Sequence, residues 1–243
     1  MHPGKIYIGT AGWGIPGIHA QHFGGEGSHL VRYGGKLNCA EINSCFYREH
    51  KQETYRKWAA AVPDGFRFSV KAPRSITHEG ELRVQGREDL KRFLEQTSTL
   101  EEKRGPVLLQ VPPKLAFDDS SARDFFSMLR ELYTGPAVFE PRHVGWFSDE
   151  AEAVLREFHV ARVAADPALL VAAAQPSGWP DPVYFRLHGS PRRYYSSYSA
   201  EYLSALAAAL LRYATSTTAW CIFDNTASGA ALANALELTL LTS

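Results

Sequence analysis

Eight short runs of strand-forming residues recur along this chain of 243 residues, and most of the gaps between them carry a helical pattern. The runs are residues 6–10, 37–43, 66–71, 107–111, 137–140, 160–166, 183–188 and 219–224. Strands that alternate with helices, without a linker or a low-complexity segment, are typical of a parallel sheet covered by helices. Eight such units in a chain of this length predict an α/β fold, a single (β/α)8 TIM barrel over residues 1–243.

Six of the gaps have apolar residues at the spacing of an amphipathic helix. They are residues 49–62, 89–104, 120–132, a segment that starts at 148, 199–213 and 228–240. Pro63 ends the first of these helices, and Ser148 is a favourable N-cap for the fourth. The gaps after the first and the sixth runs have only a weak helical pattern.

The alternation of side chains within the runs distinguishes a closed barrel from an open, doubly wound sheet, in which both faces of a strand are hydrophobic. In residues 66–71, Phe66, Phe68 and Val70 share one face, and Arg67, Ser69 and Lys71 share the other. Helices cover the outside of a barrel, so we expect the apolar faces to point outward and the polar faces into the lumen. The same rule predicts that Arg162 and Asp166 of the sixth run face inward.

Polar side chains collect at the carboxyl ends of seven of the eight runs, which is the end where TIM barrels carry their active sites. We expect the ligand-contacting residues there to be Thr10, Trp13, Asn43, Tyr47, Gln110, Arg142, Trp146, Arg186, Asp224 and Asn225. The candidate catalytic residues are Glu41, Lys71, Glu140, Asp166 and His188.

Several of these segments resemble the ordered motifs of one known family. They are GTAGW at 9–13, EINSCFY at 41–47, FRFSVKAP at 66–73, QVPP at 110–113, FEPRH at 139–143, RLHG at 186–189 and FDN at 223–225. On these motifs the chain is identified as a member of the YecE-like family, domain of unknown function 72. The resemblance implies a TIM barrel whose motifs line the mouth, and it brings no settled activity. Asp224 stands where that family usually has Asn, which adds a negative charge.

The favoured hypothesis for the mouth is acid–base chemistry on a small anionic or polyhydroxylated ligand. Arg142 and Arg186 offer forked donors for a phosphate or carboxylate. Crowding among carboxylates is expected to raise the pKa of Glu41 or Glu140 toward neutrality, which suits a general acid or base. We expect Lys71 to act as a charged clamp, because neighbouring carboxylates would keep it protonated and would disfavour a Schiff base.

Two other hypotheses stay open. Carboxylates and His188 could bind a divalent metal for phosphodiester hydrolysis, although the cations between them make no cofactor the favoured expectation. The metal hypothesis requires three or more of these groups around one ion, and a salt bridge from Arg142 or Arg186 into the cluster would oppose it. The third hypothesis is a nucleic-acid or ligand binder that uses the basic, aromatic segment 192–195.

Charge and composition limit the partners. With 26 Lys and Arg against 26 Asp and Glu, bulk binding to a polyanion or to an anionic membrane is not expected. The most apolar stretch, 203–211, is about half as long as a membrane span requires. The three cysteines form no Cys-x-x-Cys motif, and no signal-peptide pattern opens the sequence, so we expect a cytoplasmic protein.

Overall fold

The computed structural model describes residues 4–243, which form ten strands and seven α-helices. The strands are β1 (Ile6–Ala11), β2 (Cys39–Ile42), β3 (Arg67–Lys71), β4 (Arg104–Gln110), β5 (Ala137–Glu140), β6 (Val160–Arg162), β7 (Ala164–Asp166), β8 (Ser177–Gly178), β9 (Val183–Leu187) and β10 (Ala219–Phe223). The helices are α1 (His29–Gly34), α2 (Gln52–Ala60), α3 (Arg87–Ser98), α4 (Asp119–Leu132), α5 (Asp149–Glu157), α6 (Ala200–Tyr213) and α7 (Ala230–Leu241).

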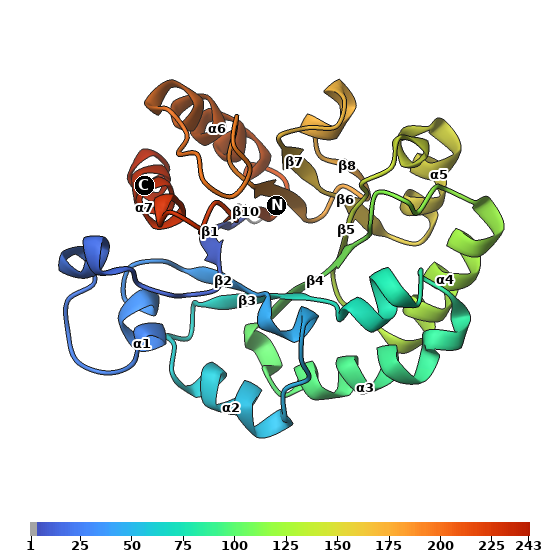
Figure 1. Ribbon diagram of the computed structural model, residues 1–243, viewed down its shortest axis with the longest axis horizontal. Helices are drawn as coiled ribbons and strands as arrows, with labels where there is room; N and C mark the ends of the chain where they lie inside the picture. Colours follow the sequence, from blue (N-terminus) through green and yellow to red (C-terminus); the bar gives the residue numbers. More distant parts are fainter. Residues whose placement is uncertain (1–3) are drawn as a thin grey trace.

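The parallel strands close into a barrel through one interrupted strand. β6 and β7 are separated only by Val163, whose N–H donates to the carbonyl oxygen of Phe139 on β5 at 2.9 Å. β6 pairs in parallel with β5, and β7 pairs in parallel with β9, so the two pieces together act as the strand that joins the ends of the sheet. Figure 1 shows the helices arranged around these strands in chain order. The predicted TIM barrel is therefore confirmed, with each of the eight predicted runs supplying one barrel strand.

The helices also match the predicted segments, with ends that differ by a few residues. The two weak gaps contain little α-helix: the first holds a short 3-10 turn and α1, and the second holds a 3-10 turn at Val171–Ala174 followed by β8. Four prolines between 167 and 182 lack the backbone N–H that a helix needs, which explains the irregular second gap.

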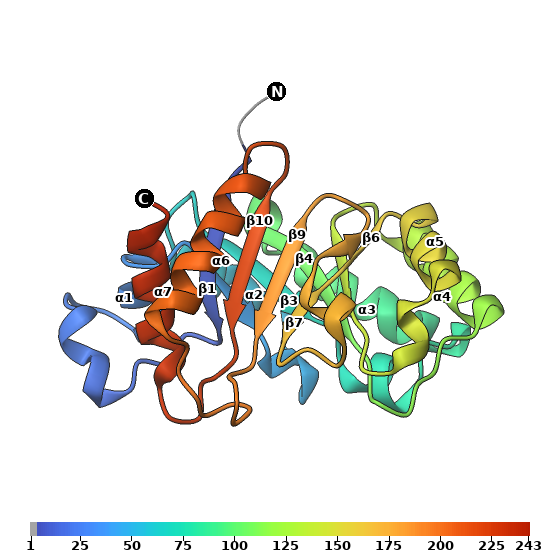
Figure 2. The same cartoon turned by 90° about the horizontal axis from the view of Figure 1, so that it is seen from above.

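Two separate apolar layers follow from the alternation within the strands. Phe68 and Val70 of β3 belong to the layer between barrel and helices, whereas Leu108 of β4 and Val138 of β5 belong to a smaller cluster inside the lumen. Figure 2 shows β9 and β10 running side by side toward the same end of the molecule, where the loops of the barrel mouth follow. The polar members of the inward faces lie toward that end.

The predicted orientation of the sixth strand is wrong. Ala161 and Val163 lie in the lumen cluster and Ala164 in the outer layer, so Arg162 and Asp166 face outward. Arg162 can face outward because α5 supplies a counter-charge: its Nε lies 3.5 Å from the Glu152 carboxylate. At β6 and β7 the small apolar side chains of Ala161 and Val163 therefore fill the lumen.

Among residues 4–243, every helix is too short or too polar to cross a membrane.

β1 and β2 approach each other so closely at Gly9 that this position requires a residue without a side chain. A Cβ atom at Gly9 would lie 2.0 Å from the carbonyl oxygen of Cys39 on β2. We expect Gly9→Ala to lower the free energy of unfolding by about 1–3 kcal/mol, as overpacking does in a tight core. Gly14→Ala is the control, because a Cβ there meets nothing within 4 Å, and its effect should stay within about 0.5 kcal/mol. Urea unfolding measures both, and equal effects would contradict this packing.

Candidate functional site

A single guanidinium lies at the centre of the polar cluster in the barrel mouth. Arg186 of β9 has a relative exposure of 1%. It binds Glu41 of β2 in a bidentate pair, with Nη2–Oε1 at 2.8 Å and Nε–Oε2 at 3.0 Å. It also lies 3.2 Å from Glu140 of β5 and 3.1 Å from Asp224, which follows β10. Although burial opposes its charge, the three carboxylates together hold the pKa of Arg186 well above its ordinary value.

His188 and Arg142 form a second layer around the same carboxylates. The Nη2 atom of Arg142 lies 2.6 Å from Glu140, and His188 Nδ1 lies 3.0 Å from Asp224. His188 Nε2 lies 2.8 Å from Glu140 Oε1 and 2.7 Å from Arg142 Nη2. The ring can therefore accept a hydrogen bond from Arg142 when Nε2 carries no proton, or donate one to Glu140 when it does.

Two carboxylates of this cluster, Glu140 and Asp224, are stabilised in their charged form. Burial raises the pKa of Glu140, but the charges of Arg142 and Arg186 outweigh it, so the pKa lies well below its usual range. The pKa of Asp224 is likewise lowered, because Arg186 and the hydrogen bond from His188 outweigh burial. The expectation of a raised carboxyl pKa is thus wrong for Glu140, since arginines separate the carboxylates from one another.

Lys71 differs from the other charged groups in this cluster, because it is buried without a partner. The residue ends β3 and has a relative exposure of 6%. Among residues 4–243, no carboxylate lies within 4 Å of its Nζ, which sits 4.1 Å from the centre of the Phe46 ring. Burial and the nearby charge of Arg186 outweigh the carboxylates and lower the pKa of Lys71 to about 8. The carboxylates raise the pKa of Lys71, as expected, but they do not offset burial, so the pKa stays below that of an ordinary lysine.

Three of the predicted ligand contacts lie around this entrance. Asn43 follows β2 and Gln110 ends β4, and both are half-buried. The Oδ1 atom of Asn43 is buried and has no hydrogen-bond partner within residues 4–243. Tyr47 is 73% exposed on the adjoining 3-10 turn and packs edge-on against Phe46.

Five other predicted residues lie outside the lumen. The Thr10 hydroxyl binds Gly12 and Tyr33, Trp13 packs against Trp58 and Phe68, and the Trp146 indole donates to the carbonyl of Leu115. Asp166 accepts a hydrogen bond from Tyr198 at 2.9 Å, and the Asn225 amide donates to Ser196 and Asn234. These side chains hold loops and helices in place around the mouth and do not join the carboxylate cluster.

Sequence analysis missed two residues beneath the cluster. The Tyr184 hydroxyl lies 3.1 Å from Glu41 Oε2 and 2.8 Å from Ser69 Oγ, and all three groups are buried. Tyr184 lies two residues before Arg186 on the same face of β9, so the alternation that placed Arg186 in the lumen also indicated Tyr184. Its role was missed because a tyrosine in a strand is equally typical of an apolar core.

Comparison with known proteins shows to which family this sequence belongs. Residues 7–243 match the model of a family described as protein of unknown function DUF72. The UPF0759 protein YecE of Escherichia coli K12 is 31% identical over 166 residues, which cover 63% of this chain and 55% of that protein. The UPF0759 protein YunF of Bacillus subtilis is 25% identical over 59% of this chain and 52% of that protein. The chain thus spans about half the length of the relatives it matches.

Solved structures support the fold. A DUF72 family protein from Enterococcus faecalis superposes with a TM-score of 0.81 at 21% identity, covering 98% of this chain and 95% of the other. A DUF72 family protein from Thermotoga maritima superposes with a TM-score of 0.78 at 24% identity, covering 98% of each chain. A D-psicose 3-epimerase from Clostridium cellulolyticum reaches a TM-score of 0.53 at 9% identity, covering 89% of this chain and 93% of that one. At these identities the superpositions show the barrel and no shared chemistry.

The lowered pKa values of Glu140 and Asp224 make the stability of the fold depend on pH. A carboxyl group whose pKa falls on folding stabilises the native state above its unfolded pKa of about 4, and this stabilisation is lost as the pH falls through the folded value. We expect the free energy of unfolding to decrease steeply below about pH 4. Glu140→Gln should lower it by about 3–5 kcal/mol at pH 7 and flatten the acid limb.

Urea unfolding between pH 3 and pH 7 measures both effects. Glu102→Gln, on an exposed turn, is the matched control and should leave the pH profile of the native protein unchanged. An acid limb of the same slope in Glu140→Gln and in the native protein would contradict the role of this carboxylate.

Proposed function

This chain belongs to the DUF72 family, whose membership supplies no activity, and we propose from the site itself that it is an enzyme acting on a small anionic or polyhydroxylated ligand at the barrel mouth. The chemistry is acid–base catalysis without a metal. The observation that carries this proposal is the unpaired amino group of Lys71, which lies beside a cluster of carboxylates that are all paired.

Lys71 favours an anionic group close to its Nζ. Glu41, Glu140 and Asp224 carry three negative charges against the two positive charges of Arg186 and Arg142, and the ammonium form of Lys71 balances the third without a direct ion pair. A phosphate or carboxylate near Nζ would form that direct ion pair. The Oδ1 atom of Asn43 and the outer edge of Asp224 offer acceptors for ligand hydroxyl groups.

The same amino group suits proton transfer. With a pKa of about 8, roughly a tenth of Lys71 is a neutral amine at pH 7, whereas an ordinary lysine is almost entirely protonated. A general base works best when its pKa lies near the working pH, so Lys71 takes the role that Glu41 and Glu140 had in the sequence hypothesis. Those two glutamates hold Arg186 in place. His188, which is fully buried, acts on the ligand through Arg142 and Asp224, as a positioning residue.

The position of Arg186 argues against the metal hypothesis. Its guanidinium lies between the carboxylates, where a divalent ion would have to sit, and supplies the positive charge that such an ion would bring. Within residues 4–243, no three His, Cys, Asp or Glu side chains are placed to hold one metal ion. The proposed mechanism therefore uses protonation of side chains instead of a Lewis acid.

Ligand binding provides the first test. Sugar phosphates, carboxylated sugars and their uncharged parent sugars are screened by thermal shift at pH 6.5, 7.5 and 9. We expect a charged member to stabilise the protein below about pH 8 and to lose this effect above it, because Lys71 then loses its charge. Lys71→Met should abolish the shift, and Lys51→Met, at an exposed lysine, should retain it. A charged ligand that shifts both variants equally would contradict the proposal, as would the failure of every charged compound.

The reactivity of the amine provides the second test. Acetylation of Lys71, followed by mass spectrometry from pH 6 to pH 10, should reach half its maximal rate near pH 8. The reason is that only the neutral amine attacks the reagent. The peptide that carries the exposed Lys51 serves as the internal reference. A midpoint for Lys71 above pH 10 would remove the general base from the mechanism.

A further inference from the structure

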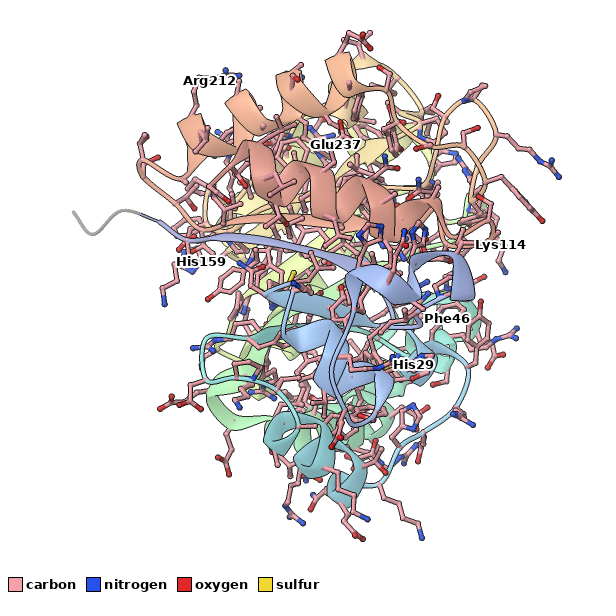
Figure 3. The ribbon with its side chains drawn as sticks, turned by 90° about the vertical axis from the view of Figure 1, so that its left-hand side faces the viewer. His29, Phe46, Lys114, His159, Arg212 and Glu237 are labelled. Carbon is pink, nitrogen blue, oxygen red and sulfur yellow. The ribbon has the colours of Figure 1, made fainter. Side chains whose placement is uncertain are left out.

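A second cleft opens at the opposite end of the barrel, where the strands begin. It has a volume of about 770 Å³ and is lined in part by Tyr7, Arg67, Arg104, Trp179 and Trp220. Figure 3 shows His159, another lining residue, far from Phe46 and Lys114 at the mouth. Pockets of about 300–1,000 Å³ are typical of small-molecule sites. The cleft is thus large enough for a ligand of its own.

Two arginines give this cleft an uncompensated positive charge. The Nη1 atom of Arg67 donates to the carbonyl oxygens of Asp64 and Phe66, and the Nη1 atom of Arg104 donates to that of Leu94. Neither guanidinium has a carboxylate within 4 Å among residues 4–243. Their Nε and Nη2 groups form no hydrogen bond with those residues, so both arginines keep donors for a ligand.

The acidic residues on the rim do not cancel this charge. Glu157 pairs with Arg123 at 2.6 Å, on the helix side of the rim. Asp181 accepts hydrogen bonds from the Thr217 hydroxyl and the Thr218 N–H at 2.6 and 3.2 Å. These contacts hold Glu157 of α5 against α4 and Asp181 against Thr217 and Thr218, and they leave the arginine donors free.

The floor of the cleft is aromatic. Tyr7 and Trp220 stack with ring centres 4.5 Å apart and are 7% and 3% exposed. Trp220 fits because residue 105 is glycine: a Cβ there would lie 2.4 Å from the indole ring. Within residues 4–243, the Tyr7 hydroxyl and the Trp220 N–H have no hydrogen-bond acceptor, so both add donors to those of the arginines.

The side wall is aromatic as well and is held in place by a third arginine. Trp179 lies against His159 with ring centres 3.9 Å apart, and Trp179 is half-buried. Arg130 donates to the carbonyl oxygens of Phe158 and His159 and to that of Gly135 across the cleft edge. It therefore fixes the two loops that form the wall.

We propose that this cleft is a binding site for a nucleoside monophosphate, with the phosphate on Arg67 and Arg104 and the base against Trp179. Free donors without acceptors match the oxygens of a phosphate, and forked guanidinium groups bind such oxygens in pairs. Flat aromatic surfaces match a nucleobase, which stacks on indole with a gain of about 1–3 kcal/mol per base. A bare phosphate would use the arginines but leave most of the cleft unfilled.

Calorimetric titration at low salt tests this assignment with AMP, GMP, CMP, UMP, adenosine, ribose 5-phosphate and a single-stranded pentanucleotide. We expect at least one monophosphate to bind more tightly than ribose 5-phosphate. The double substitution Arg67→Ala with Arg104→Ala should weaken it at least about tenfold, and Trp179→Leu should weaken the nucleotide but not ribose 5-phosphate. Arg83→Ala, at an exposed residue before α3 and outside the cleft lining, is the surface control. Thermal melts verify that each variant is folded.

The outcomes separate this site from the mouth and from a nucleic acid. If the monophosphate that binds the native protein no longer bound to Lys71→Met but still bound to the double variant Arg67→Ala with Arg104→Ala, the nucleotide would lie at the mouth. This result would overturn the assignment. So would a failure of all four monophosphates to bind at about 1 mM. A pentanucleotide that binds at least about tenfold more tightly than every monophosphate would make the ligand a nucleic-acid strand instead of a free nucleotide. Normal sugar-phosphate binding at the mouth in the arginine variant would show that the two sites are independent.

Discussion

The guanidinium of Arg186, buried between three carboxylates, is the interaction on which the rest of the barrel mouth depends. It joins β9 to side chains from β2, β5 and the end of β10, so it ties together strands that lie on different sides of the lumen. Buried charges are costly unless each is paired and hydrogen-bonded, and here the bidentate contact with Glu41 meets both conditions. Loss of this one side chain would leave several negative charges in the interior without a counter-charge.

The pairing around Arg186 also decides which residue remains available for chemistry. Each carboxylate of the cluster is bound by an arginine, and Glu140 and Asp224 also contact His188, so all three are held in place. Lys71 shares the burial of this region but not its pairing, and its pKa is therefore lowered to about 8. In the proposed mechanism, the acids that look catalytic in the sequence thus serve as the framework, and Lys71 beside them is the reactive group.

The sequence was sufficient for the barrel and for much of the mouth. Strict alternation in residues 66–71, with an aromatic or aliphatic side chain at every second position, predicted that Lys71 faces the lumen. The same rule failed at residues 160–166, because alanines occupy both faces and either orientation satisfies the helices outside. Trp13 and Trp146 lie beyond their strand ends, where alternation no longer fixes the direction of a side chain. The direction of a pKa shift depends on which charges touch, and spacing along the chain does not contain that information.

The interrupted strand gives the lumen two unlike walls. Ala165 of β7 lies in register with Arg186 of β9, and Ala161 and Val163 continue this hydrocarbon surface below it. The carboxylates and cations come from the other strands, so a molecule in the mouth meets charge on one side and methyl groups on the other. A molecule with one polar and one apolar edge is then favoured with its apolar edge toward β6 and β7 and its polar edge toward the carboxylates and cations. The interrupted strand that closes the barrel therefore also sets the direction in which an occupant of the mouth lies.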